Sequence, residues 1–234
     1  MEGLKQQQGS MQDSEKLCNK CGGKLSQFHY KLGYCEECRE ILQKESKAKD
    51  MKDNPGKYME GFPKRFLKWD FESVMPKYQK LIKGNINSNG LFLTGKTGSG
   101  KTCLMCVLAK EMVRNGRVFT FKNVSDLLFE IKSTFDKKGG IFNDYDIINN
   151  FAKKPYLILD DIGSEKVSEY VRQSLYVLIN KRYLDELPTY ITSNLTLDEI
   201  AGNLDDRVSS RIAEMTTVIS LGNKDLRLER STNN

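Results

Sequence analysis

Short runs of apolar residues alternate along most of the chain with longer segments in which apolar residues recur every three or four positions. The continuous runs predict strands at 91–94, 117–121, 155–161 and 189–192. The periodic segments predict helices at 101–114, 125–135, 145–151 and 168–186. We expect Ser125 to be the N-cap of its helix. Strands this uniformly apolar are buried on both sides, so the pattern predicts an α/β fold in which helices cover both faces of a parallel sheet.

The residues between the first predicted strand and its helix match the phosphate-binding pattern G-x-x-x-x-G-K-[ST]. The match comprises Gly95, Lys96, Thr97, Gly98, Ser99, Gly100, Lys101 and Thr102. Its glycines allow a tight turn whose N–H groups face phosphate oxygens, while Lys101 reaches the β- and γ-phosphates and the Thr102 hydroxyl can ligate Mg²⁺. A preceding strand and a following helix are the context that this motif requires. The sequence therefore predicts a P-loop that binds ATP or GTP.

Two other predicted strands end in polar side chains that suit the same chemistry. The run at 155–161 ends in Asp160 and Asp161, which we expect to face Mg²⁺ and the attacking water, respectively. The alternative is a strand that ends at a solvated turn. Asn194 follows the run at 189–192, at the sheet edge where ligands lie in such folds, and its amide could orient water. The alternative is a turn-forming Asn before the Thr196-x-x-Glu199 capping box.

Four cysteines form two C-x₂-C pairs, Cys18 with Cys21 and Cys35 with Cys38, separated by thirteen residues. This spacing is typical of a zinc ribbon, in which four thiolates complete a closed structural Zn²⁺ site. Disulfide pairing is the alternative, and a reducing compartment argues against it.

The other candidate metal ligands are assigned no chemistry. We expect His29, the single histidine, to be a loop or packing residue. Cys103 and Cys106 also read C-x₂-C, but they lie among the apolar residues of the helix that follows the P-loop, where Cys is often a small buried hydrophobe.

Charge and polarity divide the chain into three parts. We expect a zinc-binding domain at 1–42, a charged helical extension fading into a linker at 43–61, and an ATPase domain at 62–234. The aromatic and basic stretch at 62–71 is interpreted as packing onto the ATPase core rather than as a nucleic-acid stacking surface. A net charge of +6 favours polyanionic partners. With no apolar run of membrane-spanning length and no signal peptide, the sequence predicts a cytoplasmic protein without membrane association.

Six segments together resemble the DnaC/IstB branch of AAA+ ATPases, and the resemblance covers about residues 62 to 227. They are the segments at 64–71, 95–102, 159–165, 180–183, 192–195 and 206–212. The resemblance implies an AAA+ sheet without a separate lid domain, Mg²⁺-dependent ATP hydrolysis and a homo-oligomer in the ATP state. It implies that Arg211 is an arginine finger inserted into a neighbour's site, with Arg207 as the competing candidate. It also implies that Arg227 senses the γ-phosphate.

The zinc module favours helicase loaders over transposition helpers within this branch. The resemblance then implies that the N-terminal zinc domain binds a replicative DNA helicase and that the chain helps to place it on single-stranded DNA. Four residues after the second strand are the expected DNA contacts: Lys122, Lys132, Ser133 and Thr134. Three alternatives remain open at this point: an IstB-like transposition helper that acts on duplex DNA, a metabolic P-loop kinase, and a module in which ATP is a static ligand.

Overall fold

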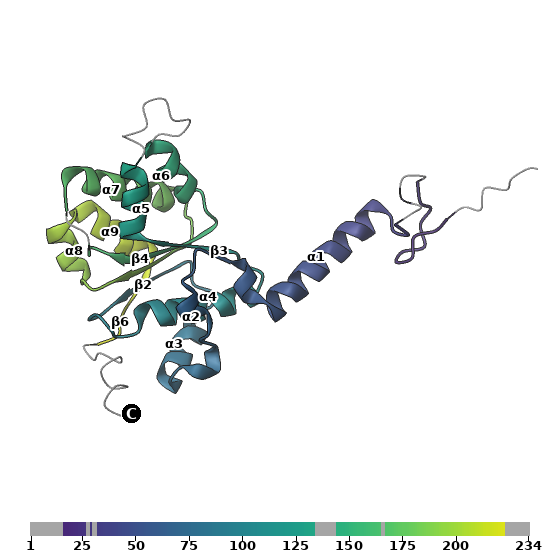
Figure 1. Cartoon of the computed structure of the whole chain (residues 1–234), viewed down its shortest axis with the longest axis horizontal. Helices are drawn as coiled ribbons and strands as arrows, with labels where there is room; N and C mark the ends of the chain where they lie inside the picture. Colours follow the sequence, from purple (N-terminus) through teal and green to yellow (C-terminus); the bar gives the residue numbers. More distant parts are fainter. Residues whose placement is uncertain (1–15, 27–28, 30–31, 134–143, 165–166, 223–234) are drawn as a thin grey trace, which may run out of the picture. The chain divides into compact units, whose positions relative to one another are not determined.

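The computed structural model describes residues 16–26, 29, 32–133, 144–164 and 167–222 (Figure 1). The chain divides into two compact units, Met1–Lys49 and Asp50–Asn234. Helix α1 (Glu36–Asp53) begins in the first unit and ends in the second. No described helix is long and apolar enough to cross a membrane.

The expected linker at 43–61 is helical up to Asp53, and its last part packs with the second unit. After α1, the 3₁₀ helix η2 (Pro55–Tyr58) and strand β1 (Met59–Glu60) lead into the sheet. The reason is apolar burial, since Met51 and Met59 are 4% and 5% exposed and pack in the core of the second unit. The sequence did not predict this packing, because two methionines among charged residues do not form a recognisable apolar pattern.

The second unit is built on a six-stranded sheet with the order β1-β3-β4-β5-β2-β6. The strands after β1 are β2 (Gly90–Thr94), β3 (Phe119–Asn123), β4 (Tyr156–Ile162), β5 (Thr189–Ser193) and β6 (Thr217–Ser220). Every strand pair in the described sheet is parallel. All side chains of β2 and β5 are buried, in agreement with the predicted two-sided cover.

Helices lie on both faces of this sheet (Figure 1). One face is covered by α2 (Lys64–Leu67), the 3₁₀ helix η3 (Phe71–Ser73), α3 (Pro76–Asn85) and α4 (Lys101–Arg114). The other is covered by α5 (Val124–Lys132), α6 (Asp144–Ala152), α7 (Glu169–Leu184), α8 (Leu197–Asn203) and α9 (Asp206–Met215). Because alternate strand residues face opposite sides, Ile158 packs in the first layer and Leu157 and Leu159 in the second.

The predicted element boundaries are wrong around β3. This strand covers Phe119–Asn123 rather than 117–121, and α5 begins at Val124. The N-cap is Asn123, whose side-chain oxygen accepts from the Ser125 N–H at 3.0 Å, so Ser125 is not the cap. An Asn and a Ser two positions apart are both good caps, and only the tertiary position of the strand selects between them.

A buried arginine on α7 connects the end of α6 with the residues that precede β4 and β5. Arg182 is fully buried, and its guanidinium donates to the carbonyls of Ala152 (2.9 Å), Lys154 (2.7 Å) and Pro188 (2.7 Å). Burial lowers the pKa of Arg182 to about 10, which still leaves it charged at neutral pH. It thereby fixes the end of α6 and the start of β5, the strand that carries the site residues described next.

Candidate functional site

The carboxyl ends of the central strands open into a cavity of about 540 Å³. The P-loop residues from Thr97 to Thr102 form one side of it, and side chains from the ends of β4 and β5 form its floor. Parallel α/β sheets place ligands at this edge. The structure therefore brings the predicted P-loop, the two aspartates and Asn194 to a single cavity.

The P-loop has the backbone geometry of a phosphate cradle. Gly98 and Gly100 have φ values of 82° and 94°, which favour glycine, and Gly100 is the N-cap of α4. A Cβ on Gly95 would lie 3.1 Å from the carbonyl oxygen of Gly222 and 3.1 Å from the Ser99 Oγ. That buried Ser99 hydroxyl has no hydrogen-bond partner among the described residues. Close backbone approach and an orphaned donor suit a loop that wraps an anion.

Lys101 is held over the loop by three acceptors. Its side chain is buried, and Nζ donates to the carbonyls of Gly95 at 2.7 Å and Lys96 at 3.0 Å. The third acceptor is Asn194 Oδ1 at 2.8 Å. This ammonium lies where the β- and γ-phosphates of a nucleotide would meet the loop.

Asp160 is buried at the end of β4 and accepts two hydroxyl hydrogen bonds. The donors are Thr102 Oγ1 at 2.8 Å and Thr192 Oγ1 at 2.7 Å. Burial raises the pKa of Asp160, and the charge of Asp161 raises it further, while the two hydroxyls oppose the shift. A bound divalent cation would relieve this cost of burying a carboxylate. The contact with Thr102 places the two predicted Mg²⁺ ligands side by side.

Asp161 adopts a left-handed backbone conformation, with φ of 64°. The register of β4 against β5 shifts between Leu159 and Ile162, which allows this residue to turn out of the strand. Its N–H donates to Thr192 Oγ1 at 2.9 Å, and its carboxylate accepts from Asn194 Nδ2 at 2.7 Å. Asp tolerates this conformation better than most residues do. Thr192, which supports both aspartates, was not predicted as a site residue.

Asn194 links the ammonium of Lys101 to the carboxylate of Asp161 through the two ends of its amide. The predicted capping box also exists, with the Thr196 hydroxyl accepting from the Glu199 N–H at 3.3 Å. The box involves Thr196 and not Asn194. The amide lies beside the P-loop, where its oxygen accepts from Lys101 Nζ.

The segment before β2 also lines the cavity. Its apolar side chains there form what we call the apolar wall: Phe66, Trp69, Val74, Met75 and Tyr78. Arg65, Lys68 and Ser73 of the same segment line the cavity as well. The predicted packing of the 62–71 aromatics is confirmed, since they pack against the core cluster around α4. Their position along the cavity was not predicted, because it depends on how the segment before β2 folds back over α4.

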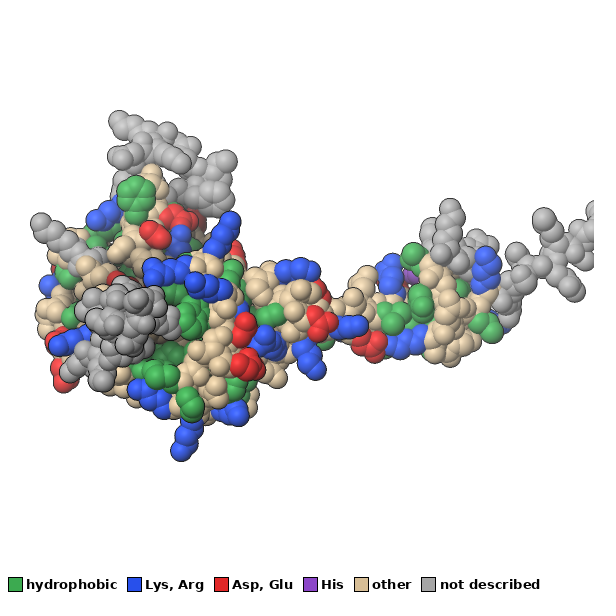
Figure 2. Space-filling model, turned by 60° about the horizontal axis from the view of Figure 1, so that its bottom comes forward, with side chains coloured by type: hydrophobic (Ala, Val, Ile, Leu, Met, Phe, Trp, Pro, Cys, Tyr) green, Lys and Arg blue, Asp and Glu red, His purple; other side chains and the backbone are tan. Residues whose placement is uncertain are grey.

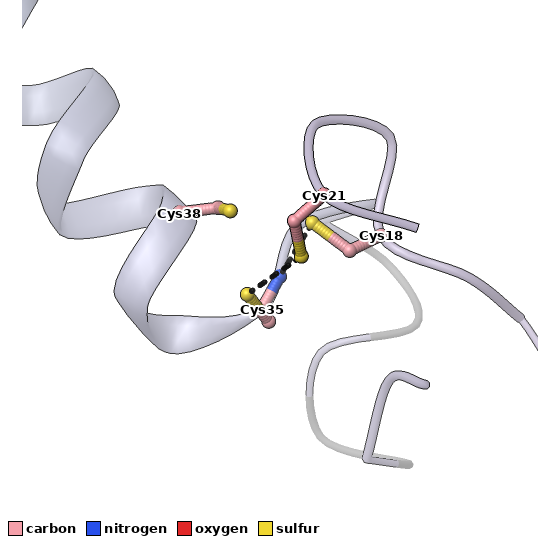
Figure 3. A group of neighbouring side chains, drawn as sticks. All are labelled: Cys18, Cys21, Cys35 and Cys38. Atoms are coloured by element: carbon pink, nitrogen blue, oxygen red, sulfur yellow. Dashed lines mark hydrogen bonds between the residues drawn. The ribbon is translucent and has the colours of Figure 1, made fainter. Parts of the chain in front are cut away.

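The four predicted thiol ligands converge in the first unit (Figure 3). All four Sγ atoms lie within 4.8 Å of one another, and those of Cys21 and Cys35 are 3.7 Å apart. A tetrahedron with Zn–S bonds of about 2.3 Å has edges of about 3.8 Å, so the group fits a zinc ion. The described cysteines carry no disulfide in this structure.

The fold around the thiols differs from a two-knuckle ribbon. Leu17 and Lys24 pair around a tight turn that carries the first two cysteines, but Cys35 precedes α1 and Cys38 lies in its first turn. N–H groups of Cys21 and then Cys35 lower the pKa of Cys18 to about 6, whereas burial raises the pKa of Cys38 to about 12. His29 bonds Ser26 at 2.6 Å and does not belong to the group, as predicted.

The two candidate finger arginines lie together on α9 and do not line the cavity. Arg207 makes a bidentate ion pair with Asp205, at 3.0 and 2.8 Å, and its guanidinium lies 4.2 Å from the Tyr176 ring centroid. Arg211 donates to Asn180 Oδ1 at 2.7 Å, and its guanidinium lies 5.0 Å from the Tyr176 ring centroid. Both arginines are therefore oriented at the surface rather than turned toward their own P-loop.

The expected DNA contacts differ in their surroundings. Lys122 forms an ion pair with Glu130 and lies 5.3 Å from the Phe151 ring centroid, whereas Lys132 and Ser133 are exposed at the end of α5. Lys/Arg and Asp/Glu side chains are interspersed on the visible face of the molecule (Figure 2). Thr134 and Arg227 lie outside the described residues, so their roles stay predictions.

The sheet order, the P-loop between β2 and α4 and the polar ends of β4 and β5 define the AAA+ class of P-loop folds. The chain belongs to the family described as IstB-like ATP binding protein, which matches residues 30–233. The predicted resemblance to DnaC/IstB-type ATPases is thereby confirmed.

The similar proteins include helicase loaders. The replicative helicase loader DnaC of Escherichia coli K12 is 26% identical over 136 residues, 58% of this chain and 54% of that protein. The loader DnaI of Bacillus subtilis is 30% identical over 127 residues, 54% of this chain and 38% of that protein. The crystal structure of the DnaC helicase loader has a TM-score of 0.60 and 27% identity, and the match covers 68% of this chain and 99% of that one. The chain spans about half the length of the curated relatives that it matches.

Proposed function

We propose that this chain is an ATP-dependent helicase loader. It would bind a hexameric replicative helicase through the cysteine-containing unit and help to place it on single-stranded DNA. The observation that carries the proposal is the likeness to the DnaC helicase loader, whose solved chain is matched over 99% of its length. The nucleotide cavity and the four-thiol group support it, because they would supply a switch and a separate binding unit in one chain.

ATP and Mg²⁺ fit the cavity through this chain's own residues. The P-loop N–H groups from Gly98 to Thr102 and the Lys101 ammonium would hold the phosphates. The Thr102 hydroxyl and the Asp160 carboxylate, already 2.8 Å apart, would hold Mg²⁺, which neutralises charge on the β- and γ-oxygens. Asp161 and Asn194, which are hydrogen-bonded to each other, would orient the attacking water. The apolar wall would receive the nucleoside, because a base offers the flat apolar surface that phosphates lack.

Two substitutions test the proposed division between binding and hydrolysis. Lys101→Ala is expected to weaken ATP binding, because it removes the cation that faces the phosphates. Asp161→Asn should keep ATP affinity within a few-fold and reduce turnover by about 10²- to 10⁴-fold, since water activation is a transition-state task. Calorimetric affinities and steady-state ATPase rates for both variants provide the comparison. Equal losses of affinity in the two variants would contradict the assigned roles.

Arg211 is proposed as the residue that completes the ATP site of a neighbouring subunit. Neither it nor Arg207 lines the cavity of its own chain, so either could reach a γ-phosphate only across an interface. ATP would then favour a homo-oligomer, because the γ-phosphate bound by one subunit would attract the Arg211 guanidinium of the next. Arg227 stays a candidate γ-phosphate sensor, and the carbonyl of Gly222, five residues earlier in the sequence, lies beside the P-loop at Gly95.

Zinc is proposed to hold the first unit together. Cys18, Cys21, Cys35 and Cys38 would all be ligands, which leaves no open position for catalysis. Among the described residues of this unit, the buried cluster comprises Leu25 and two of the cysteines, so the ion would supply order that so small a cluster cannot. A compact unit separate from the nucleotide-binding unit suits the capture of a partner protein.

Single-stranded DNA is proposed to run past the end of α5. Affinity should fall with salt at a slope of about −0.7 per phosphate neutralised, and Lys132→Ala should flatten that slope by about 0.7. Lys122→Ala should flatten it less, because Lys122 is already paired with Glu130. Lys80→Ala, an exposed lysine on the opposite layer, is the matched control. The measurement is fluorescence anisotropy of labelled oligonucleotides over a salt series. A slope equally insensitive to all three changes would place the DNA elsewhere.

The second candidate function is a transposition helper that acts on duplex DNA. The family description, IstB-like ATP binding protein, favours it. A preference for duplex over single strands in the presence of ATP, without binding to a replicative helicase, would select this function over the loader.

A further inference from the structure

One buried lysine on α4 has no role in phosphate binding and contacts the segment that carries the apolar wall. The Lys110 side chain is only 6% exposed, although lysine is among the residues least often buried. A buried ammonium is costly unless it is fully hydrogen-bonded. Its surroundings therefore need an explanation beyond helix packing.

The Lys110 ammonium is surrounded by acceptors from the short connection between α2 and η3. It donates to the carbonyl of Leu67, to the carbonyl of Trp69 at 2.7 Å and to Asp70 Oδ1 at 3.1 Å. All three acceptors lie within four consecutive residues. The ammonium thus fixes the backbone of one turn, and this turn contributes Lys68 and Trp69 to the lining of the cavity.

Lys110 lies on α4, the helix that begins at the end of the P-loop. Helix α4 begins at Lys101, so the helix that carries the phosphate-binding lysine at its start also holds the apolar wall through Lys110. The distance between the wall and the phosphates is then set by one rigid helix. A nucleotide that reaches from the loop to the wall would need that spacing.

We propose that Lys110 is a positioning residue for nucleoside recognition, which holds the turn of Trp69 at the distance from the P-loop that a nucleoside triphosphate spans. The proposal rests on the proposed ATP binding. It predicts that Lys110 contributes to the affinity for the nucleoside end of the ligand and not to that for the phosphates. A merely structural role would weaken both alike.

The test compares ATP with inorganic tripolyphosphate, each with Mg²⁺, on the full-length chain. Lys110→Met keeps the length and apolar volume of the side chain and removes its three donors. We expect it to weaken ATP binding about tenfold, the size of one well-placed contact, and to change tripolyphosphate binding by less than about twofold. Arg114→Met is the matched control, because Arg114 also contacts Asp70, at 3.5 Å, but neither carbonyl. It should leave both affinities within about twofold of the unchanged chain.

Trp69 supplies a second readout, because it is the only tryptophan of the chain. Lys110→Met should shift its emission to longer wavelength and reduce the change caused by ATP. Asp70→Ala changes a side chain that is 43% exposed. It should shift the emission and weaken ATP binding in the same direction by a smaller amount, and it replaces Lys110→Met in the test if that variant does not fold. Unchanged ATP affinity in Lys110→Met, or an equal loss for ATP and tripolyphosphate, would overturn the proposal. Failure of the unchanged chain to bind ATP would instead overturn the proposed function.

Discussion

Arg211→Ala is expected to lower the rate of ATP hydrolysis by about 10³- to 10⁵-fold, the size known for an arginine supplied from outside the site. Its affinity for ATP should stay close to that of the unchanged chain, because Arg211 does not line the cavity of its own subunit. Arg211 donates to Asn180 Oδ1, to the Tyr176 hydroxyl and to the Arg207 carbonyl, and it would exchange these contacts for those with a neighbour's phosphate. The measurements are steady-state ATPase rates and calorimetric affinities at matched concentrations.

Arg207→Ala is the matched control for this prediction. Arg207 is committed to the bidentate pair with Asp205, and leaving that pair would cost the interaction that holds it. We therefore expect a much smaller loss of rate in this variant. Mixing Arg211→Ala with Asp161→Asn should restore part of the activity, because some junctions then combine an intact finger with an intact site. An absence of rescue in verified mixed oligomers, or a larger loss in Arg207→Ala, would contradict the role of Arg211.

The cysteine unit is expected to contain one zinc ion per chain and to unfold when the ion is removed. Structural zinc contributes on the order of 10 kcal/mol to small domains, and the buried cluster in the described part of this unit is small. Cys21→Ser should abolish stoichiometric zinc, whereas Cys103→Ser, which alters the other C-x₂-C pair, should retain it. Elemental analysis of protein purified without chelators measures the first effect.

Chelation should then expose the first unit to protease while the second unit keeps its ATP affinity. The basis is that the two units are compact separately and the thiols all belong to the first. Full zinc retention by Cys21→Ser, or no zinc in the unchanged chain, would refute the four-thiol site. Loss of ATP binding on chelation would show that the units do not fold independently.

The sequence predicted those parts of the site that are local in the chain. The P-loop is a contiguous motif between a strand and a helix, and the aspartates follow a continuous apolar run, so both could be placed from pattern alone. Thr192 could not, because its bonds to Asp160 and Asp161 depend on β4 and β5 being neighbours in register. The same holds for the apolar wall, which requires the segment before β2 to fold over α4.

Several fold details escaped prediction for related reasons. The two-residue β1 and the four-residue β6 are too short for a periodic signal, and each is recruited by pairing with a neighbouring strand. Lys110 reads as an ordinary polar position of α4, yet three acceptors from a distant turn bury it. Composition also could not show that Met51 and Met59 pack in the core of the second unit.

Capture of the cognate replicative helicase in the presence of ATP tests the loader function most directly. The comparison is between the full-length chain and the Asp50–Asn234 unit, a boundary that keeps Met51 in the core. We expect the full-length chain to capture the helicase and transfer it to single-stranded DNA. The Asp50–Asn234 unit should bind ATP and single strands but leave the helicase in solution. Capture and loading by this unit alone, or no capture by the full-length chain, would contradict the proposed function.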